Sequence, residues 1–331
     1  MSTEVPYPSP GHATRRYAKH CVHPSSSERT RTRSLGRAVA DRAPAAGSFR
    51  LSPHRSPTLV SVPTARGLLA LLGASHPGPV VAVTSLTALL ATGVGHDLRS
   101  GAVVTAAVAA GQLSIGWSND LVDASRDRQV GRRDKPLARG EITEHGVRVA
   151  VGVALVACVA LSLACGTRSA VVHLSLGVAS GLVYNLAVKR TVWSAAPYAV
   201  AFGSLPAVVT LALAHPQLPP VWMVVTGALI GVGAHLLNAL PDLADDARTG
   251  VNGWPQRLGP RRVRLLAPVI LVAASALTVF GPGDRIPAWS WALMGGCLAL
   301  GVVAAAGRGR VPFLAAVSIA ALDVMALVLR S

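Results

Sequence analysis

The chain has 331 residues, of which 51% are apolar and 14% charged, and its formal net charge is +16. This composition excludes an ordinary soluble globular protein and indicates an integral membrane protein. The positive charge does not indicate a nucleic-acid partner, because half of it lies in residues 1–66 and the rest in loops between apolar runs.

Residues 1–66 are rich in Ser, Pro, Arg and His, and they hold eleven basic and three acidic residues. They contain no apolar run long enough for a signal peptide or a membrane span. We expect a disordered basic tail at 1–66, followed by a transmembrane domain at 67–331. Two interpretations of the tail remain open, a dispensable extension and a segment that binds anionic lipid headgroups.

From residue 76 onward, apolar runs of about twenty residues recur, which is the length that crosses the hydrocarbon core of a membrane. They predict nine spans, at residues 76–94, 99–121, 146–165, 169–188, 192–214, 220–241, 263–281, 286–306 and 311–329. The expected fold is therefore an all-α integral membrane protein, a bundle of nine transmembrane helices. Its many small residues suit close packing of helices in lipid.

Basic residues mark alternate loops between these spans. The loops after spans two, four, six and eight hold fifteen Lys and Arg residues, whereas the opposite loops hold three. Because short cytoplasmic loops accumulate Lys and Arg, this bias predicts a multi-pass protein of the cell membrane with its N-terminus in the cytoplasm.

The second span ends in a group of acidic residues. Asn119, Asp123 and Asp127 are spaced four apart, so on a helix they share one face, and Asp120 lies at the edge of that face. Carboxylates at the end of a membrane span are costly if they have no partner. The group therefore predicts a site for cations at the cytoplasmic side.

Three residues at the end of the fourth span are further candidates. Tyr184 could simply end the helix, and Lys189 and Arg190 could bind an anion or belong to the general cytoplasmic bias.

The sixth span repeats the acidic pattern. Asn238, Asp242 and Asp246 have the same spacing, 119 residues after the first set, and Asp245 lies between the two acids as a ligand or a bystander. His235, one turn before Asn238, is expected to contact a neighbouring helix. In the last span, Asp323 is an isolated intramembrane acid and a functional candidate.

Two facing groups of carboxylates suit Mg²⁺, which takes oxygen ligands and is commonly shared with substrate phosphates. Nearby Lys and Arg side chains would neutralise the remaining charge of a diphosphate. An apolar bundle behind such a site would hold a hydrocarbon tail. The combination indicates a polyprenyl diphosphate as substrate.

These motifs resemble the signatures of the UbiA superfamily of intramembrane prenyltransferases, over about residues 66–331. The first signature, NDxxDxxxD, is present as NDLVDASRD at residues 119–127. The element DKPLARG at residues 134–140 is similar to the family's NRPLxxG, with Asp134 and Lys135 in place of Asn and Arg. The second signature, DxxxD followed by a glycine, matches Asp242, Asp246 and Gly250, and an RLG element stands at residues 257–259.

The resemblance implies ionisation of an allylic diphosphate with Mg²⁺ and transfer of the prenyl group to an acceptor, often an electron-rich ring such as a quinone precursor. It implies six metal ligands, which are Asp120, Asp123, Asp127, Asp242, Asp245 and Asp246. It further implies diphosphate contacts from Asn119, Arg126, Arg132, Arg133, Lys135, Lys189, Arg190 and Asn238. Asp123, Asp242 and Tyr184 are the expected catalytic residues.

Two other functions remain open. A terpene cyclase on the same scaffold would need a single prenyl diphosphate, because the substrate's own double bonds capture the cation. A transporter is disfavoured, because its acids more often lie at the bilayer midplane in broken helices.

Overall fold

A computed structural model describes residues 65–329, apart from residue 249 and residues 284–285, and it leaves the side chains of residues 244, 245, 327 and 328 undescribed. The described part of the chain consists of helices and loops and contains no strand. The tail expected at residues 1–66 lies outside the described residues except for its last two positions. The domain boundary at residue 66 therefore stays a prediction.

The first two helices form a sharp corner. Helices α1 (Ala65–Ala74) and α2 (Pro77–Gly93) are bent by 75° relative to each other. His76 at the corner has a φ of 58°, in the left-handed region that a residue with a side chain rarely adopts. Proline at the first position of α2 suits a helix start, because its missing N–H needs no partner there.

Helix α3 (Leu98–Gln129) is the longest element and extends eight residues beyond the predicted end of the second span at residue 121. It begins at Asp97, whose carboxylate accepts hydrogen bonds from the backbone N–H groups of Arg99 and Ser100. Helix α4 (Glu144–Ala164) returns beside α3 and is capped by the Thr143 hydroxyl.

The fourth predicted span is helical but irregular. It consists of α5 (Thr167–Val172), the π-helix η1 (His173–Val178), α6 (Ala179–Val183) and the π-helix η2 (Tyr184–Val188). A π turn contains more residues than an α turn, so it rotates the side chains that follow it. The side chain of Asn185 in η2 donates to the backbone oxygen of Ile115 in α3, at 2.9 Å. This bond ties the irregular turn to the helix that carries the first acidic group.

Helices α7 (Ala196–Thr210) and α8 (Val221–Ala239) pack against each other. After α8 the chain forms a 3-10 turn, η3 (Leu240–Asp242), and then the short helix α9 (Leu243–Arg248). Helix α10 (Trp254–Phe280) contains a kink at Gly259, whose φ is 76°. Helices α11 (Trp289–Ala306) and α12 (Val311–Val328) complete the bundle.

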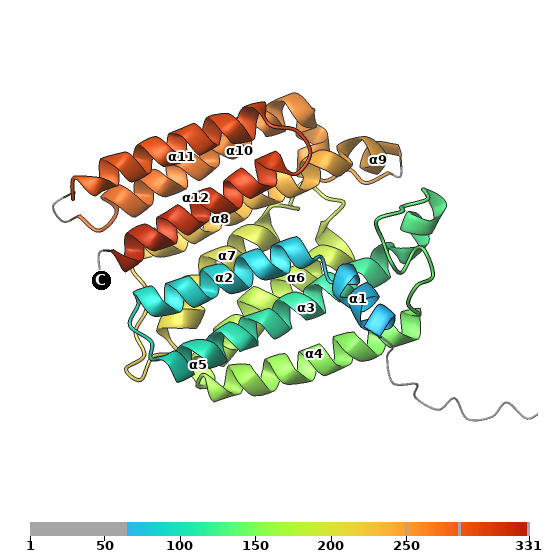
Figure 1. Cartoon of the computed structure of the whole chain (residues 1–331), viewed down its shortest axis with the longest axis horizontal. Coiled ribbons are helices and arrows are strands. Elements are labelled where there is room, and N and C mark those ends of the chain that lie inside the picture. Colours follow the sequence, from blue (N-terminus) through green and yellow to red (C-terminus); the bar gives the residue numbers. More distant parts are fainter. Residues whose placement is uncertain (1–64, 249, 284–285, 330–331) are drawn as a thin grey trace, which may run out of the picture. The chain divides into compact units, whose positions relative to one another are not determined.

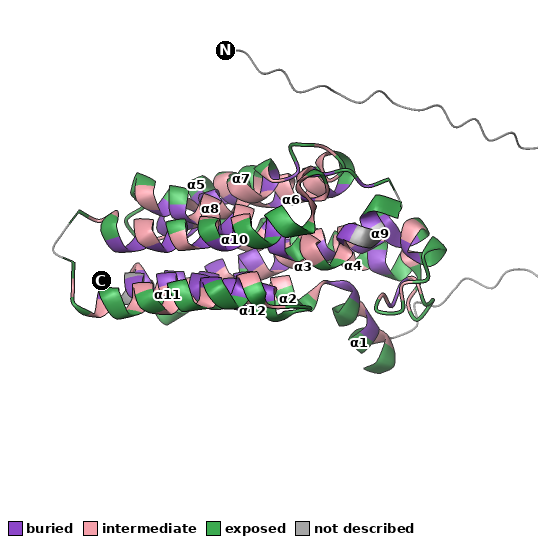
Figure 2. Cartoon of the chain, turned by 90° about the horizontal axis from the view of Figure 1, so that it is seen from above, coloured by how far each residue is buried: buried purple, intermediate pink, exposed green. Residues whose placement is uncertain are grey.

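The helices run roughly side by side, with α1, α9 and the loop after α3 at one end of the bundle and the end of α12 at the other (Figure 1). Buried residues form stripes along helices such as α10 and α12, next to exposed residues on the same helices (Figure 2). One core cluster joins α8, α10, α11 and α12 around Leu236, Leu271 and Ile319.

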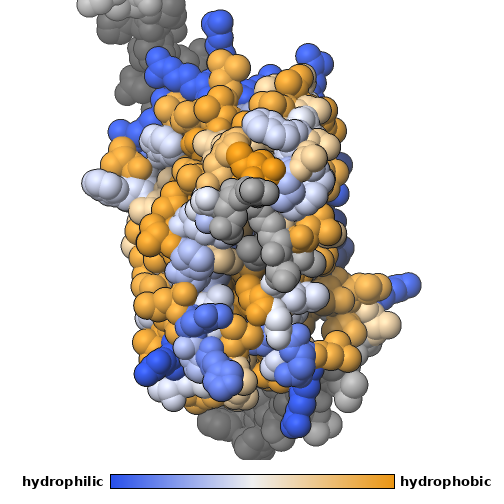
Figure 3. Space-filling view, turned by 90° about the vertical axis from the view of Figure 1, so that its left-hand side faces the viewer, coloured by the Kyte–Doolittle hydropathy of each residue, from blue (hydrophilic) through white to orange (hydrophobic). Residues whose placement is uncertain are grey.

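Many exposed side chains are large and apolar, such as Val153, Val156 and Val302, which are 65%, 71% and 68% exposed. Apolar side chains also cover much of the bundle end opposite α9, where hydrophilic ones form separate groups (Figure 3). Among the described residues, six helices are long and apolar enough to cross a membrane, or seven if α1 and α2 form one bent span. Helices α7 and the first part of α12 are apolar but shorter. The chain is thus a multi-pass membrane protein, while the count of nine stays a prediction.

Candidate active site

The first acidic group lies on α3 as the spacing predicted. Asp120, Asp123 and Asp127 are almost fully buried, with 1%, 4% and 2% of their surfaces exposed. All three belong to the last three turns of the helix, at the end of the bundle that also holds α9. Buried carboxylates need partners, and the chain supplies them from several elements.

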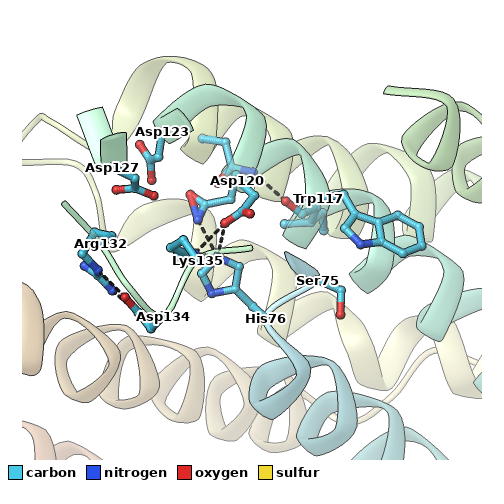
Figure 4. A network of polar contacts seen from close by, with 12 residues as sticks. Ser75, His76, Trp117, Asp120, Asp123, Asp127, Arg132, Asp134 and Lys135 are labelled. Atoms are coloured by element: carbon cyan, nitrogen blue, oxygen red, sulfur yellow. Dashed lines mark hydrogen bonds and ion pairs between the residues drawn. The ribbon is translucent and has the colours of Figure 1, made fainter. Parts of the chain in front are cut away.

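Asp120 is held by residues from two separate segments. Lys135, in the loop after α3, places its ammonium group 2.7 Å from Asp120 Oδ1 and 2.7 Å from His76 Nε2. His76 also contacts the side-chain amide of Asn119, at 3.0 Å. Figure 4 shows Lys135 between His76 and Asp120, with Asp123 and Asp127 farther along the same helix. The sharp corner between α1 and α2 is what brings His76 to this position.

Asp123 contacts two basic side chains. The Lys189 ammonium, just beyond η2, donates to Asp123 Oδ2 and, at 3.2 Å, to Asn119 Oδ1. Arg126 lies 3.2 Å from the same carboxylate and 3.5 Å from Asp127 Oδ1. The pairing between α3 and the end of the fourth predicted span supports the placement of Lys189 in the site.

The second acidic group differs from the prediction in its geometry. Asn238, Asp242 and Asp246 do not share the face of one regular helix, because α8 ends at Ala239 and the chain passes through η3 before α9. Pro241 lies in this turn, and proline cannot donate the backbone hydrogen bond that a continuing α-helix requires. The second group therefore differs from the first in lying on an interrupted helix, although Asn238, Asp242 and Asp246 all line one cavity.

The two acidic groups nevertheless meet. Arg126 from α3 reaches Asp246 Oδ1 at 3.5 Å, and Arg132 reaches Asp242 Oδ1 at 3.1 Å. The side-chain amide of Gln256 donates to Asp246 Oδ2 at 2.7 Å. Burial raises the pKa of Asp246 above its usual 3.8, and the Gln256 hydrogen bond opposes that shift. Asp245 lies outside the residues whose side chains the structure describes.

Arg132 also forms a bidentate ion pair with Asp134, in which both N–O distances are 2.8 Å. The hydrogen bonds from Arg132 lower the pKa of Asp134 from 3.8 to about 2. A carboxyl whose pKa is lowered by folding stabilises the fold above its ordinary pKa, and this contribution is lost as the pH falls through about 2. The pair therefore stays intact at neutral pH and orients the Arg132 guanidinium toward Asp242.

A cavity of about 210 Å³ opens between these groups. Its polar part includes Asp123, Asp127, Asp242 and Asp246 together with four basic side chains, Arg126, Arg132, Lys135 and Lys189. Its apolar part is lined by residues from α2, α8 and α12, among them Leu86, Ile230, Phe313 and Val317. One cavity thus combines a charged head region with a hydrocarbon-like wall.

Aromatic rings lie along the same cavity. Tyr184 and Tyr198 both line it, and their ring centroids are 5.1 Å apart in an edge-to-face arrangement. His235 lies 4.6 Å from the Tyr198 ring, and its Nε2 is 3.1 Å from the Ser194 hydroxyl. The interhelical contact predicted for His235 is therefore present, although the residue also borders the cavity.

Residues 80–326 match the UbiA prenyltransferase family. The chain belongs to this family. No sequence among the curated proteins matches the chain.

Solved structures of UbiA homologues share the fold. A homologue from Archaeoglobus fulgidus bound to GPP and Mg²⁺ is 15% identical, with a TM-score of 0.62 over 79% of this chain and 100% of that chain. The apo structure of a homologue from Aeropyrum pernix K1 is 17% identical, with a TM-score of 0.62 over 75% of this chain and 97% of that chain. A structure described as digeranylgeranylglyceryl phosphate synthase in membranes is 18% identical, with a TM-score of 0.56 over 79% of this chain and 97% of that chain.

The UbiA motif glycines have a structural reason in this chain. Gly140 ends the DKPLARG element with a φ of 75°, and Gly259 in RLG has a φ of 76° at the kink of α10. Both values lie in the left-handed region, which glycine adopts without a steric cost. The kink turns the start of α10, including Gln256, toward Asp246.

The structure brings most of the predicted site residues to the cavity. Asp120 does not line it but contacts the lining residue Lys135. Asn119, Asn238 and Tyr184 line the cavity with the charged residues named above. Arg133 and Arg190 are exposed and do not line it. Sequence reasoning missed His76, Tyr198 and Gln256, which all line the cavity. Only Gln256 had a signal, its place directly before the RLG element.

Carboxylate oxygens are suitable donors for a hard divalent cation, and Asp120 Oδ2 is buried without a hydrogen-bond partner among the described residues. Within the described residues, however, no three acidic, histidine or cysteine side chains converge closely enough to hold one metal ion. The five described acids of the motifs instead each contact a basic side chain. The oxygens of these carboxylates suit a divalent cation, provided that the basic side chains now in contact with them move to the oxygens of a bound anion.

Proposed function

We propose that this chain is an intramembrane prenyltransferase that ionises a prenyl diphosphate with Mg²⁺ and transfers the prenyl group to an acceptor. The observation that carries the proposal is the single cavity whose mouth holds carboxylates and basic groups and whose inner wall is apolar. A diphosphate on a hydrocarbon chain has the same two-part chemistry. Two structures of a UbiA homologue from Archaeoglobus fulgidus, bound to GPP and Mg²⁺ and to DMAPP and Mg²⁺, support this assignment.

In this proposal the acids of the two motifs hold the cation. Asp123, Asp127, Asp242 and Asp246 face the cavity, and Asp120 and Asp245 complete the predicted set. Bound Mg²⁺ supplies positive charge at the phosphate oxygens, where negative charge develops as the diphosphate leaves. The basic side chains that contact the carboxylates would turn to the phosphate oxygens when the diphosphate binds.

The reaction breaks the allylic C–O bond, and the diphosphate leaves with the electron pair. An electron-rich acceptor then donates a pair to the allylic carbon and loses a proton. Tyr184 and Tyr198 line the same cavity as the acids, and electron-rich rings there would stabilise the cation by cation–π attraction. The apolar wall excludes water, which would otherwise capture the cation.

We further propose nine membrane crossings, with the N-terminus and both acidic groups at the cytoplasmic side. The basic bias of alternate loops supports this orientation. The count is supported by the two shorter apolar helices, α7 and the first part of α12, which add to the seven longer or bent spans.

The test uses membranes that contain the full-length protein, labelled geranyl, farnesyl and geranylgeranyl diphosphates, and Mg²⁺. We expect a labelled lipid product that is lost on exhaustive chelation and restored by added Mg²⁺. Full turnover after chelation would reject the metal assignment. Purified protein with a single prenyl diphosphate and no acceptor separates transfer from cyclisation, because only a cyclase forms a cyclic terpene under that condition.

A further inference from the structure

His76 has an unusual backbone conformation at the corner between α1 and α2. Its φ is 58°, and no other non-glycine residue in the described part of the chain has a positive φ. A residue with a side chain keeps such a strained conformation only where the surrounding structure holds it there. Directly before it, the buried residue Ser75 donates its hydroxyl to the Leu72 backbone oxygen at 2.7 Å and closes the end of α1. The corner thus fixes the backbone of His76 beside the acidic end of α3.

The side chain of His76 contacts two residues of the site through one ring nitrogen. Its Nε2 atom lies 2.7 Å from Lys135 Nζ and 3.0 Å from Asn119 Nδ2. The Lys189 ammonium donates to Asn119 Oδ1 at 3.2 Å, which fixes the orientation of that amide. An ammonium group and an amide N–H can only donate, so His76 Nε2 accepts and the ring proton lies on Nδ1. His76 is therefore a neutral acceptor among charged groups.

Lys135 divides its N–H groups between an anion and this neutral partner. One N–H donates to Asp120 Oδ1 at 2.7 Å and another to His76 Nε2 at the same distance (Figure 4). An ammonium group has three N–H donors, so one remains. Lys135 also lines the active-site cavity, whereas Asp120 does not. The remaining donor of Lys135 is thus available to an anion that enters the cavity.

We propose that His76 is a positioning residue that orients Lys135 toward the diphosphate of the substrate. This inference rests on the proposed function. With two N–H groups held by Asp120 and His76, the direction of the third is set, whereas Asp120 alone would leave the ammonium free to rotate about its Cε–Nζ bond. His76 is also neutral, so it holds the ammonium without offsetting its charge. A diphosphate in the cavity then meets a fixed donor that is still positively charged.

The experiment measures binding and needs no acceptor. Geranyl and geranylgeranyl thiodiphosphates, in which sulfur replaces the bridging oxygen and slows ionisation, bind to the purified full-length protein in the presence of Mg²⁺. His76→Leu removes the acceptor from the side chain. His76→Gln is the matched variant, because its amide oxygen can accept from Lys135 and remains neutral. Both replacements place an ordinary side chain on the same left-handed backbone, so the backbone strain is similar in the two.

A double-mutant cycle separates positioning from a general effect on structure. The same His76→Leu substitution is made in a Lys135→Gln background, in which the ammonium is absent but an amide can still donate to Asp120. Melting temperatures in detergent show that each variant is folded. The comparison of His76→Leu with His76→Gln stands without this background.

We expect His76→Leu to lower the affinity for both analogues about tenfold, the loss that follows when a hydrogen bond to a charged group is removed. The loss is equal for the two chain lengths, because Lys135 acts on the diphosphate that both share. His76→Gln stays within about threefold of wild type, since it keeps the bond to Lys135. In the Lys135→Gln background, His76→Leu changes the affinity by less than about twofold.

Equal losses in His76→Gln and His76→Leu would overturn the positioning role. A tenfold loss that persists in folded Lys135→Gln protein, or a loss confined to one chain length, would do the same. Failure of the wild-type protein to bind either analogue with Mg²⁺ instead overturns the proposed function.

Discussion

Asp123 lies where basic side chains from two elements converge. Lys189, just beyond η2, and Arg126 on α3 both contact its carboxylate, although the side chain of Asp123 is only 5% exposed. A buried carboxylate with two cations is well stabilised in the absence of substrate. The same cations are within reach of any anion that enters the cavity, since Lys189 and Arg126 also line it. The residue can therefore exchange a basic partner for a divalent cation without being left unpaired.

We predict that Asp123→Asn lowers prenyl transfer by about 10²- to 10³-fold, the usual loss when one group that stabilises developing charge is removed. The variant should insert into membranes normally, because asparagine is similar in size and can still hydrogen-bond with Lys189. Turnover is measured with a labelled prenyl diphosphate at saturating Mg²⁺.

The matched control is Glu141→Gln. Glu141 is an exposed acid that pairs with Arg139 at 2.7 Å and does not line the cavity. Its loss should leave turnover within about twofold, as expected for an exposed ion pair. Wild-type turnover in Asp123→Asn would reject the role of this carboxylate.

At the scale of elements, the corner between α1 and α2 docks against α3 at close range. The Trp117 side chain donates to the Leu71 backbone oxygen at 2.8 Å, which fixes α1 on α3. A Cβ atom at Gly116 would lie 2.0 Å from the Ser75 backbone oxygen. Only glycine permits this approach, and the approach sets the position of His76 beside Lys135 and Asn119.

We predict that Gly116→Ala pushes the corner away from α3. Overpacking of this kind costs about 1–3 kcal/mol, so the melting temperature in detergent should fall. Affinity for a prenyl thiodiphosphate with Mg²⁺ should fall as well, because His76 and Lys135 move relative to Asp120.

Gly152→Ala in α4 provides the comparison, because a Cβ there meets nothing within 4 Å. Alanine at that position should be neutral or stabilise the protein by about 0.5–1 kcal/mol, the usual gain in a helix interior. Equal effects of the two substitutions would show that the close approach at Gly116 has no importance.

At the scale of the whole molecule, both acidic groups must open on the same side of the membrane. Their side chains meet through Arg126 and Arg132, so the ends of α3 and α8 lie together. The loop after α3 is strongly basic, which predicts that this side faces the cytoplasm.

We predict that single cysteines at Gln129 and Ala247 in a cysteine-free background are protected from an impermeant thiol reagent in intact cells. A cysteine at Ser331 should react, because an odd number of crossings places the C-terminus outside. Both protected positions should become reactive once the cells are permeabilised. Labelling of only one of the two in intact cells would contradict the shared site.

We also predict that deletion of residues 2–60 leaves turnover in detergent within about twofold of the full chain. The segment carries neither an apolar run long enough to span nor either acidic motif. The measurement compares both proteins at equal amounts of folded enzyme. A well-folded truncation without activity would give the tail a catalytic role.

The sequence by itself determined the class of the protein and predicted the residues of its site. Apolar runs fix the approximate place of each span, because the membrane thickness sets the length of a helix. The spacing of Asn119, Asp123 and Asp127 determined one shared face, since α3 is a regular helix. The UbiA motifs were recognisable for the same reason, as they are continuous stretches of local sequence.

Only the tertiary structure decided what depends on contacts between distant segments. The second acidic group lies on a helix interrupted at Pro241. Arg126 and Arg132 join it to the first group across 120 and 110 residues of chain. His76 reaches the site because α1 and α2 form a bend and because its own backbone is left-handed. The local sequence predicts neither feature. Asp323 was visible as an isolated acid, but its hydrogen-bond partner Ser275 lies on another helix. Helix packing sets these relationships, and periodicity within one segment carries no information about them.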